Sequence, residues 1–207
     1  DLSLLRTTRP RKPSGVQKAI QEAGEYANLV AQRTEITLFQ VLYTDFTEMI
    51  YAHGDRKAFL MPIIDHGSKL ACGWAVGQSS NTALALQAWA RAKETFQELT
   101  VSPVGMIMHH DRDPVYTGYE WTTQLLVEDR LRLSYALRGA RDNPEMESFN
   151  GRFKTEGHSL FVEAQTLAEL SQIVDKRMAY YNAERRHSSI GYVPPLTYIQ
   201  QRRSREE

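Results

Sequence analysis

Three carboxylates stand where an acid is unusual. Asp45 ends the apolar stretch VLYTDF, Asp111 follows the apolar stretch VGMIMHH, and Glu147 lies within NPEMESFNGRFK. A carboxylate beside an apolar body costs stability unless it is paired or bound to a metal. If the three meet at one point, a divalent cation would relieve their repulsion, and Mg²⁺ prefers such oxygen ligands. These acids are therefore candidate metal ligands.

Each of the three also fits an ordinary structural role. Asp45 and Asp111 suit turns at strand ends, and Glu147 suits the first turn of a helix, where the helix dipole favours an acid. Their joint placement favours the metal-binding interpretation. The adjacent His109 and His110 suggest zinc, but no Cys or further His lies nearby at ligand spacing. We therefore expect His109 to pack or to form a hydrogen bond.

Periodicity predicts the elements that must position these acids. Strands are expected at 36–46, 57–67, 69–77, 104–110 and 131–137, and helices at 79–99, 118–129, from 143 onward and at 166–184. The first three strands should form an antiparallel meander, with a bulge or a shortened strand at Pro62. The order predicts an α/β fold, a mixed five-stranded sheet with helices on its faces. If strands one and four are neighbours, Asp45 and Asp111 come together.

The helix that begins near residue 143 has two stripes. Asn143 should cap it and Pro144 suits its first position. Its apolar stripe contains Met146, Phe149 and Phe153. A second stripe, displaced by about 100°, contains Glu147, Asn150 and Lys154. The helix could lie across the seam between strands one and four and bring Glu147 to the two aspartates.

Composition is that of a water-soluble globular protein. The chain has 207 residues, of which 42% are hydrophobic and 24% charged. No apolar run could span a membrane, no signal peptide is visible, and the single Cys72 excludes an internal disulfide. We expect a basic N-terminal arm or linker with a possible short helix at 1–35, a core at 36–165, and a C-terminal helix with a basic tail packed on the core at 166–207.

Charge is balanced but unevenly spread. The 25 Lys and Arg equal the 25 Asp and Glu, which taken alone argues weakly against a nucleic-acid binder. The basic residues concentrate towards both ends and the acids in the middle. This pattern suits a protein that binds phosphates at its edges and metal ions at its centre, although solvated surface charge explains it equally well.

Five motifs carry a resemblance to a known group. VLYTDFTEM resembles the first-Asp strand of bacterial insertion-sequence transposases, which share the catalytic core of retroviral integrases. DHGSKLACGWAV is similar to their second and third strands, HHDRDPVYTG to the second-Asp turn, and RDNPEMESFNGRFKTE to the Glu helix. YYNAERRHSSIGYVPPLTY resembles their closing segment, and the 35 residues between Asp111 and Glu147 (residues 112–146) also match. The resemblance spans about residues 36 to 200.

The resemblance implies a ribonuclease-H-like core of the DDE type that cleaves DNA strands and transfers them. Asp45, Asp111 and Glu147 would then bind two Mg²⁺ or Mn²⁺ ions. Lys154 would contact DNA beside them, and Arg185 and Arg186 would hold DNA phosphates. The partners implied are element ends and target DNA, a homo-oligomer when active, and no membrane, in a bacterial cytoplasm.

The chain departs from the group in two ways. His110 and Asp113 stand where the group more often has Ser and Gly, and the extra charge of Asp113 could weaken phosphate approach or recruit a cation. Residues 1–35 are also too short for the usual helix-turn-helix modules. Two alternatives stay open: a catalytically silent, domesticated DNA-binding core, and a metal-dependent nuclease of the same fold.

Overall fold

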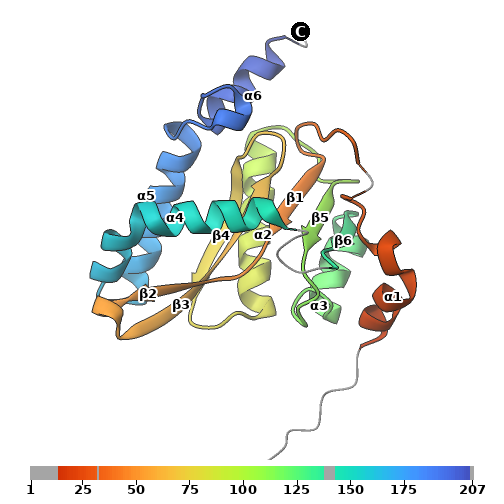
Figure 1. The fold of residues 1–207 in the computed structure, drawn as a ribbon, viewed down its shortest axis with the longest axis horizontal. Helices are drawn as coiled ribbons and strands as arrows, with labels where there is room; N and C mark the ends of the chain where they lie inside the picture. Colours follow the sequence, from red (N-terminus) through yellow and green to blue (C-terminus); the bar gives the residue numbers. More distant parts are fainter. Residues whose placement is uncertain (1–13, 32, 138–142, 206–207) are drawn as a thin grey trace, which may run out of the picture.

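The computed structural model describes residues 14–31, 33–137 and 143–205 (Figure 1). The strands are β1 (Val41–Thr44), β2 (Thr47–Tyr51), β3 (Arg56–Asp65), β4 (Ala71–Gly77), β5 (Ile107–His110) and β6 (Arg132–Tyr135). The helices are α1 (Gly15–Ala23), α2 (Thr82–Glu98), α3 (Tyr119–Thr122), which continues into the π-helical turn η3 (Thr123–Glu128), α4 (Pro144–Glu163), α5 (Leu167–Ala183) and α6 (Pro195–Arg203). Short 3-10 turns lie at η1 (Gly24–Ala27), η2 (Ala52–Gly54) and η5 (Ser188–Ile190). Residues 1–13 of the N-terminal arm predicted at 1–35 lie outside the described residues.

One mixed sheet forms the centre of the molecule. β3 pairs antiparallel with β1 and β2 along one edge and with β4 along the other. On its far side β1 pairs with β5 in parallel, and β5 pairs with β6 in parallel. The antiparallel meander followed by parallel strands confirms the predicted mixed sheet.

The predicted first strand ends at Thr44, and an additional strand, β2, follows after two residues, so the sheet of the described residues has six strands where five were expected. The registers of β1 and β2 against β3 continue each other, so Asp45 and Phe46, which belong to neither strand, stand opposite Pro62 and Met61. Pro62 has no N–H to donate to this ladder. Its carbonyl instead accepts a hydrogen bond from the Thr44 hydroxyl at 2.8 Å. The break therefore leaves Asp45 outside the regular ladder.

The boundaries of the meander also differ from the prediction. Residues 36–40 form no strand and lead into β1 through a turn, whereas β2 continues the ladder to Tyr51. The expected bulge occurs as a register shift between Ile63 and Ile64 against β4. β3 nevertheless runs for ten residues, so Pro62 does not shorten it.

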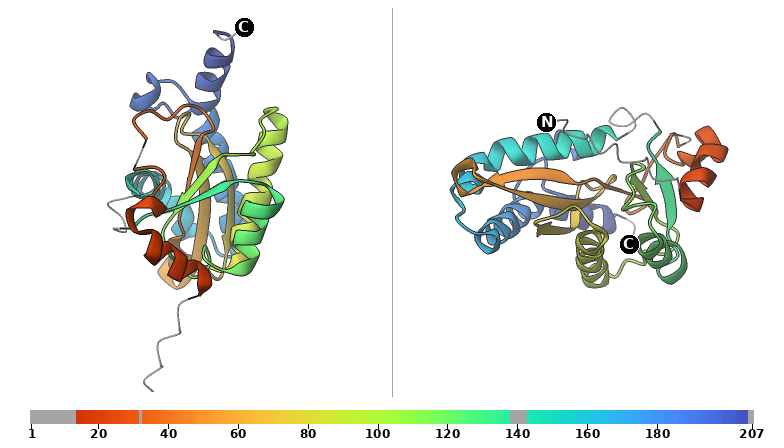
Figure 2. Two further views of the ribbon diagram at one scale, coloured as in Figure 1. Left: turned by 90° about the vertical axis from the view of Figure 1, so that its right-hand side faces the viewer. Right: turned by 90° about the horizontal axis from the view of Figure 1, so that it is seen from below.

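Successive side chains of the strands point to opposite faces of the sheet and pack into two hydrophobic cores. Val41 and Tyr43 of β1 face the core that α4 covers, whereas Leu42 faces the core of α2 and α3. Figure 2 shows α4 on one side of the sheet and α2 and α3 on the other. Helices therefore cover both faces, as the sequence predicted. α5 and α6 share these two cores, and the domain boundaries at 35 and 165 stay predictions.

α5 lies along the outer edge of β4. The Asn182 side chain donates to the Ala71 carbonyl and accepts from the Ala71 N–H, both at 2.9 Å. The Trp74 indole N–H donates to Asp175 at 2.7 Å. These bonds satisfy backbone and side-chain groups that a free sheet edge would expose.

The β3–β4 turn is held by a buried carboxylate. Asp65 accepts hydrogen bonds from the Ser68 N–H and hydroxyl, both at 2.7 Å, and from the Phe39 N–H at 2.9 Å. Burial still raises the pKa of Asp65 to about 6. Lys69 follows with a φ of 63°, in the left-handed region. The Asp65, Ser68 and Lys69 positions of the sequence motif are thus explained by the turn that they form.

Gly73 permits the close approach of α2 to β4. A Cβ at this position would overlap the Ala88 carbonyl and the Ala92 N–H of α2. Ala85 and Ala92 are fully buried on the same helix, and their small side chains let the helix lie close to the sheet.

We predict that Gly73→Ala lowers the free energy of unfolding by about 2 kcal/mol, because an added methyl group must push α2 away from the sheet. Gly151→Ala is the matched control: it adds the same methyl group inside α4, where nothing lies within 4 Å. This control should raise stability by up to about 1 kcal/mol. Urea unfolding of both variants tests the packing, and a Gly73→Ala protein as stable as wild type would contradict it.

Candidate active site

Two of the predicted carboxylates follow adjacent parallel strands. Tyr43 of β1 stands opposite His109 of β5. Asp45 and Asp111 each come two residues later, so they leave the carboxyl ends of neighbouring strands at the same edge of the sheet. Both side chains are half-buried. The expected adjacency of the first and fourth predicted strands is therefore confirmed.

α4 brings Glu147 to this edge. Pro144 occupies its first turn, and Glu147 lies exposed at the end of that turn. The expected cap by Asn143 is wrong, because the Asn143 side chain accepts no bond from the helix. Its amide instead donates a long hydrogen bond, 3.5 Å, to the carbonyl of Thr44. This contact ties the start of α4 to the end of β1.

The site concentrates negative charge. Burial raises the pKa of Asp45 to about 6, and the charges of Asp111, Asp113 and Glu147 contribute to the shift. Burial and the charge of Asp113 also raise the pKa of Asp111. Within 14–31, 33–137 and 143–205, however, no three His, Cys, Asp or Glu side chains are arranged to hold one metal ion. The three carboxylates are thus near enough to repel one another without forming a closed ligand set.

Asp113 shapes the turn beside the site. Its N–H donates to the Asp111 carboxylate at 2.9 Å, and its own carboxylate accepts from the Val115 N–H at 2.8 Å. The Asp113 side chain therefore stabilises the turn that contains it, and its charge also raises the pKa of Asp45.

His110 contacts the backbone of Asp111, and both of its ring nitrogens are engaged in hydrogen bonds within the protein. It is fully buried, and burial lowers its pKa to about 3, so the ring is neutral. Its Nδ1 lies 2.9 Å from the Asp111 carbonyl oxygen, which fits an Nδ1–H donor. Its Nε2 accepts from the Trp121 indole N–H at 3.4 Å, and the ring stacks on Tyr116.

His109 has the packing role that the sequence suggested. Its Nδ1 lies 2.8 Å from the Ser134 hydroxyl, and its ring packs edge-on against Tyr43.

The predicted phosphate-binding residues lie in different environments. Lys154 lies two turns after Glu147, half-buried in a groove with Glu48, Ile50 and His158. Arg186 is exposed just after α5. These two cations are accessible to a ligand.

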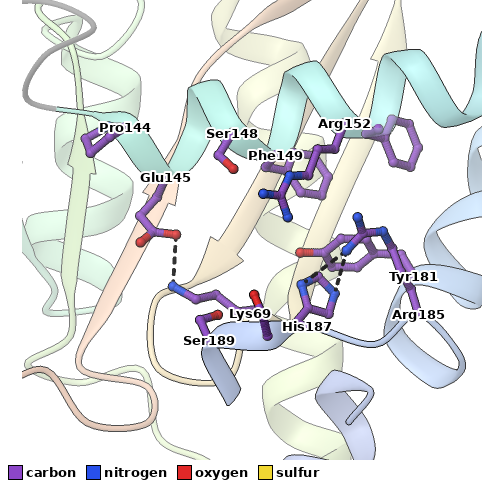
Figure 3. A pocket seen from close by; sticks show the side chains of 12 residues that line it. Lys69, Pro144, Glu145, Ser148, Phe149, Arg152, Tyr181, Arg185, His187 and Ser189 are labelled. Carbon is purple, nitrogen blue, oxygen red and sulfur yellow. Dashed lines mark hydrogen bonds and ion pairs between the residues drawn. The ribbon is translucent and has the colours of Figure 1, made fainter. Parts of the chain in front are cut away.

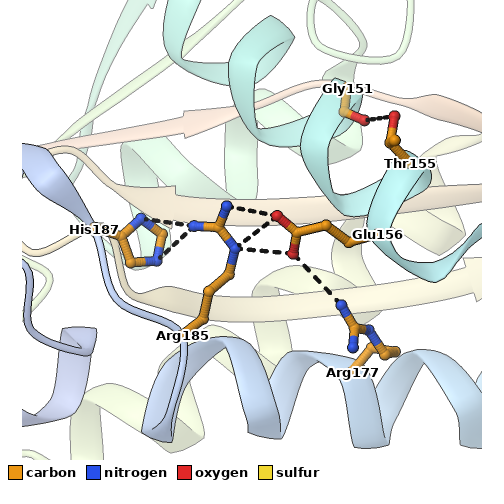
Figure 4. Close-up of polar contacts among 6 residues, drawn as sticks. All are labelled: Gly151, Thr155, Glu156, Arg177, Arg185 and His187. Atoms are coloured by element: carbon orange, nitrogen blue, oxygen red, sulfur yellow. Dashed lines mark hydrogen bonds and ion pairs between the residues drawn. The ribbon is translucent and has the colours of Figure 1, made fainter.

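Arg185 is already engaged within the molecule (Figure 4). Its guanidinium donates to both carboxylate oxygens of Glu156, at 2.7 and 2.9 Å. Arg177 approaches the same carboxylate at 3.5 Å, and His187 lies within 3.4 Å of Arg185. The hydrogen bonds from Arg185 lower the pKa of Glu156. Arg185 therefore joins α4 to the segment after α5, a pairing that no sequence pattern indicated.

Sequence reasoning also missed a cleft on the other flank of α4. Glu145, Ser148 and Arg152 line it, facing Lys69 and the segment 185–189 (Figure 3). The spacing of 145, 148 and 152 is helical, so the third stripe of α4 could have been found from the same pattern that gave the other two.

Comparisons with known proteins find similar sequences and similar folds. Residues 132–195 match a protein family described as "Integrase core domain". The chain is 32% identical, over 46% of its length, to an uncharacterized 31 kDa protein of insertion element IS600 from Shigella sonnei. It is 29% identical, over 86% of its length, to an uncharacterized transposase-like protein of Haemophilus influenzae, of which the match covers 79%.

The chain spans only part of several of these relatives. The match covers 35% of the IS600 protein and 50% of a putative transposase for IS986/IS6110 from Mycobacterium tuberculosis, to which this chain is 24% identical over 67% of its length.

Solved structures share the fold at low sequence identity. The HTLV-2 integrase catalytic core domain, in complex with magnesium, superimposes with a TM-score of 0.59 at 13% identity, over 79% of this chain and 97% of that one. The Mos1 transposase catalytic domain, with raltegravir and Mg, gives 0.51 at 17% identity, over 68% and 71%. The chain is thus similar in sequence to insertion-sequence transposases and similar in fold to integrase and transposase catalytic cores.

Proposed function

We propose that this chain is the catalytic core of a bacterial transposase, which cuts DNA at the ends of a mobile element and joins those ends to target DNA. One observation carries the proposal: Asp45 and Asp111 leave neighbouring parallel strands at one edge, and the helix with Glu147 starts beside that edge. The transposase relatives support the same activity.

Both steps of the reaction are displacements at a DNA phosphodiester. In cleavage, a water oxygen attacks phosphorus and the bond to the 3′ oxygen breaks, which leaves a 3′-hydroxyl and a 5′-phosphate. In joining, that 3′-hydroxyl attacks a phosphodiester of the target and displaces its 3′ oxygen. Each joining step replaces one phosphodiester by another, so no nucleotide hydrolysis is needed.

The carboxylates have the chemistry of a divalent-metal site. Their oxygens are the donors that Mg²⁺ and Mn²⁺ prefer. The pKa of Asp45 is raised first by burial and then by neighbouring carboxylates, whose charge a cation would neutralise. We propose that Asp45, Asp111 and Glu147 hold two such ions. When bound, the ions would activate the attacking oxygen and stabilise the leaving oxygen. The magnesium described with the HTLV-2 and Mos1 domains supports this assignment.

The surrounding cations would hold the DNA. Lys154 lies on the same flank of α4 as Glu147, and Arg186 is exposed beyond α5. Contacts of this kind position a duplex and carry little sequence information. Arg185 would first have to release Glu156, so we propose for it a smaller share of this binding.

We further propose a homo-oligomer and a cytoplasmic location. The HTLV-2 core is described in trimeric and dimeric forms, and a related integrase is described within an intasome. The named relatives come from bacteria, where the DNA substrate lies in the cytoplasm.

A catalytically silent DNA-binding core is the second candidate, because the described residues contain no ready-made metal ligand set. Labelled terminal-repeat DNA incubated with Mn²⁺ separates the candidates. A transposase cuts and joins, a nuclease only cuts, and a silent core binds DNA without product.

We predict that Asp45→Asn, Asp111→Asn and Glu147→Gln each reduce strand joining by roughly 100-fold or more, because losing a metal ligand removes several kcal/mol of transition-state stabilisation. The matched control is Asp113→Asn, which removes one charge two residues from Asp111 while its side-chain oxygen can still accept from Val115. This control should join DNA at least as well as wild type. Near-normal joining by any one of the three variants would remove that residue from the ligand set.

Stability of the metal-free protein should depend on Asp45. The pKa of Asp45, about 6 when folded against 3.8 ordinarily, means that the folded state binds the proton more tightly. Stability therefore falls as pH rises from about 4 to about 6. Asp45→Asn should remove this loss and stabilise the protein at pH 7 by about 1 kcal/mol, allowing for partial solvent screening, with no gain at pH 4.

Urea unfolding at both pH values, with and without Mg²⁺, measures this effect. Mg²⁺ should stabilise wild type at pH 7 more than the Asp45→Asn variant. Asp55→Asn, in an exposed turn, is the control and should show neither effect. An equal gain for Asp45→Asn at pH 4 and pH 7 would rule out charge repulsion as the cause.

We predict that Lys154→Ala weakens binding of any duplex and lowers the slope of log affinity against log salt by about one phosphate contact. Fluorescence anisotropy at several salt concentrations measures both quantities. Lys57→Ala is the control, since Lys57 is exposed and already paired with Glu48 at 3.0 Å. An unchanged slope for Lys154→Ala would show that this lysine is only a solvated surface residue.

A further inference from the structure

The cleft beside Glu145, Ser148 and Arg152 of α4 is a basic recess of about 230 Å³. It lies between α4, the β3–β4 turn with Lys69, and the segment after α5 that carries His187, Ser188 and Ser189 (Figure 3). Three chain segments far apart in sequence thus meet around one space.

Cations exceed anions around this space. Lys69 pairs with Glu145 at 2.9 Å, and Arg185 pairs with Glu156 at 2.7 Å. Arg152 has no ion-pair or hydrogen-bond partner among the residues that the structure describes, and its side chain reaches from α4 towards Tyr181 and His187 (Figure 3). The cleft therefore presents one uncompensated guanidinium.

His187 reports the same excess of positive charge. Its pKa is lowered to about 4, first by burial and then by the charges of Arg185, Arg152 and Lys69. The ring is therefore neutral near pH 7. The charges of Arg185, Arg152 and Lys69 at His187 thus outweigh the opposing charge of Glu156, and an anion in the adjoining cleft would be stabilised.

The remaining lining suits an oxyanion. Ser148, Ser188 and Ser189 bring hydroxyl groups to the cleft, and all three are exposed. A phosphate offers acceptor oxygens to hydroxyl and guanidinium donors alike, and Arg can bind it through two parallel hydrogen bonds.

The position of the cleft relates it to the proposed active site. On a helix with 3.6 residues per turn, Arg152 and Glu147 project from α4 in directions roughly 140° apart and about 8 Å apart along the axis. The apolar stripe of Met146, Phe149 and Phe153 is buried in the core. Helix α4 therefore presents Glu147 and Lys154 on one flank and Arg152 on the other.

We propose that this cleft binds a backbone phosphate of DNA, with Arg152 as its principal cation, Lys69 as a second, and Ser148 and Ser188 as hydroxyl donors. The inference rests on the proposed function, since it assumes that DNA is the substrate. It places one strand on the flank of α4 opposite the bond that is cut. DNA would then contact both flanks of the helix.

The test is anisotropy of a labelled duplex over a range of salt concentrations. Arg152→Ala should lower affinity about 5-fold or more and reduce the salt slope by about one, whereas Arg152→Lys should keep most of the slope. Ser148→Glu, which adds an anion at an exposed helical position, should weaken binding also. Lys18→Ala, which removes an exposed cation from α1, should change nothing. Thermal unfolding checks that each variant is folded. If the Arg152→Ala variant does not fold, the binding of the Ser148→Glu variant tests the proposal in its place.

Each outcome bears on the proposal. If Arg152→Ala and Ser148→Glu keep the wild-type affinity and slope while Lys154→Ala loses a contact, the cleft proposal is wrong and the transposase proposal stands. If wild type joins no DNA but Arg152→Ala still weakens its binding, the cleft proposal stands and the catalytic one fails. If inorganic phosphate shifts the NMR signals of Ser188 and Ser189 but DNA does not, the cleft takes free anions and the DNA assignment is overturned.

Discussion

Strand β1 hydrogen-bonds antiparallel to β3 on one side and parallel to β5 on the other. Parallel pairing places the carboxyl ends of β1 and β5 at one edge, and this is why two aspartates 66 positions apart in the sequence become neighbours. Because β1 is buried on both faces, its ladder cannot slip by one residue without turning apolar side chains to the wrong core. The spacing between Asp45 and Asp111 is therefore fixed by the sheet and not by the loops that carry them.

The break between β1 and β2 also arises from strand pairing, here with β3. Pro62 cannot complete the ladder, and the chain opposite it leaves the regular strand for two residues before resuming in register. Asp45 lies in that gap, half-buried, beside charges that raise its pKa. A carboxylate kept in such a place costs stability in the absence of a cation. The proposed metal site would offset this cost.

Helix α4 joins the sheet to the two proposed DNA-binding surfaces. One stripe packs on the core, a second carries Glu147 and Lys154, and the third lines the cleft with Arg152. The bidentate pair between Arg185 and Glu156 then fixes the segment after α5 against the helix, which closes the cleft. If DNA binds both flanks, a small shift of this one helix would alter the metal ligands and the phosphate contacts together.

Most elements could be predicted from the sequence because their apolar patterns are strong. The apolar runs in β3 and β4 and the helical spacing in α2, α4 and α5 all correspond to buried residues. The strand β2 after Asp45 and Phe46 was not predicted, since it depends on pairing with β3. The partner of Arg185 was equally hidden, because Glu156 lies 29 positions away on another helix. Asn143 resembles a cap in sequence, yet the nearby end of β1 competes for its side chain.

Paramagnetic broadening by Mn²⁺ tests most directly whether the three carboxylates form one metal site. In amide NMR spectra of the isotopically labelled protein, Mn²⁺ should broaden the signals of Phe46, Arg112 and Ser148 together, and Glu147→Gln should weaken the effect at all three. Broadening that leaves these signals unchanged, or that is confined to acids elsewhere on the surface, would contradict the account.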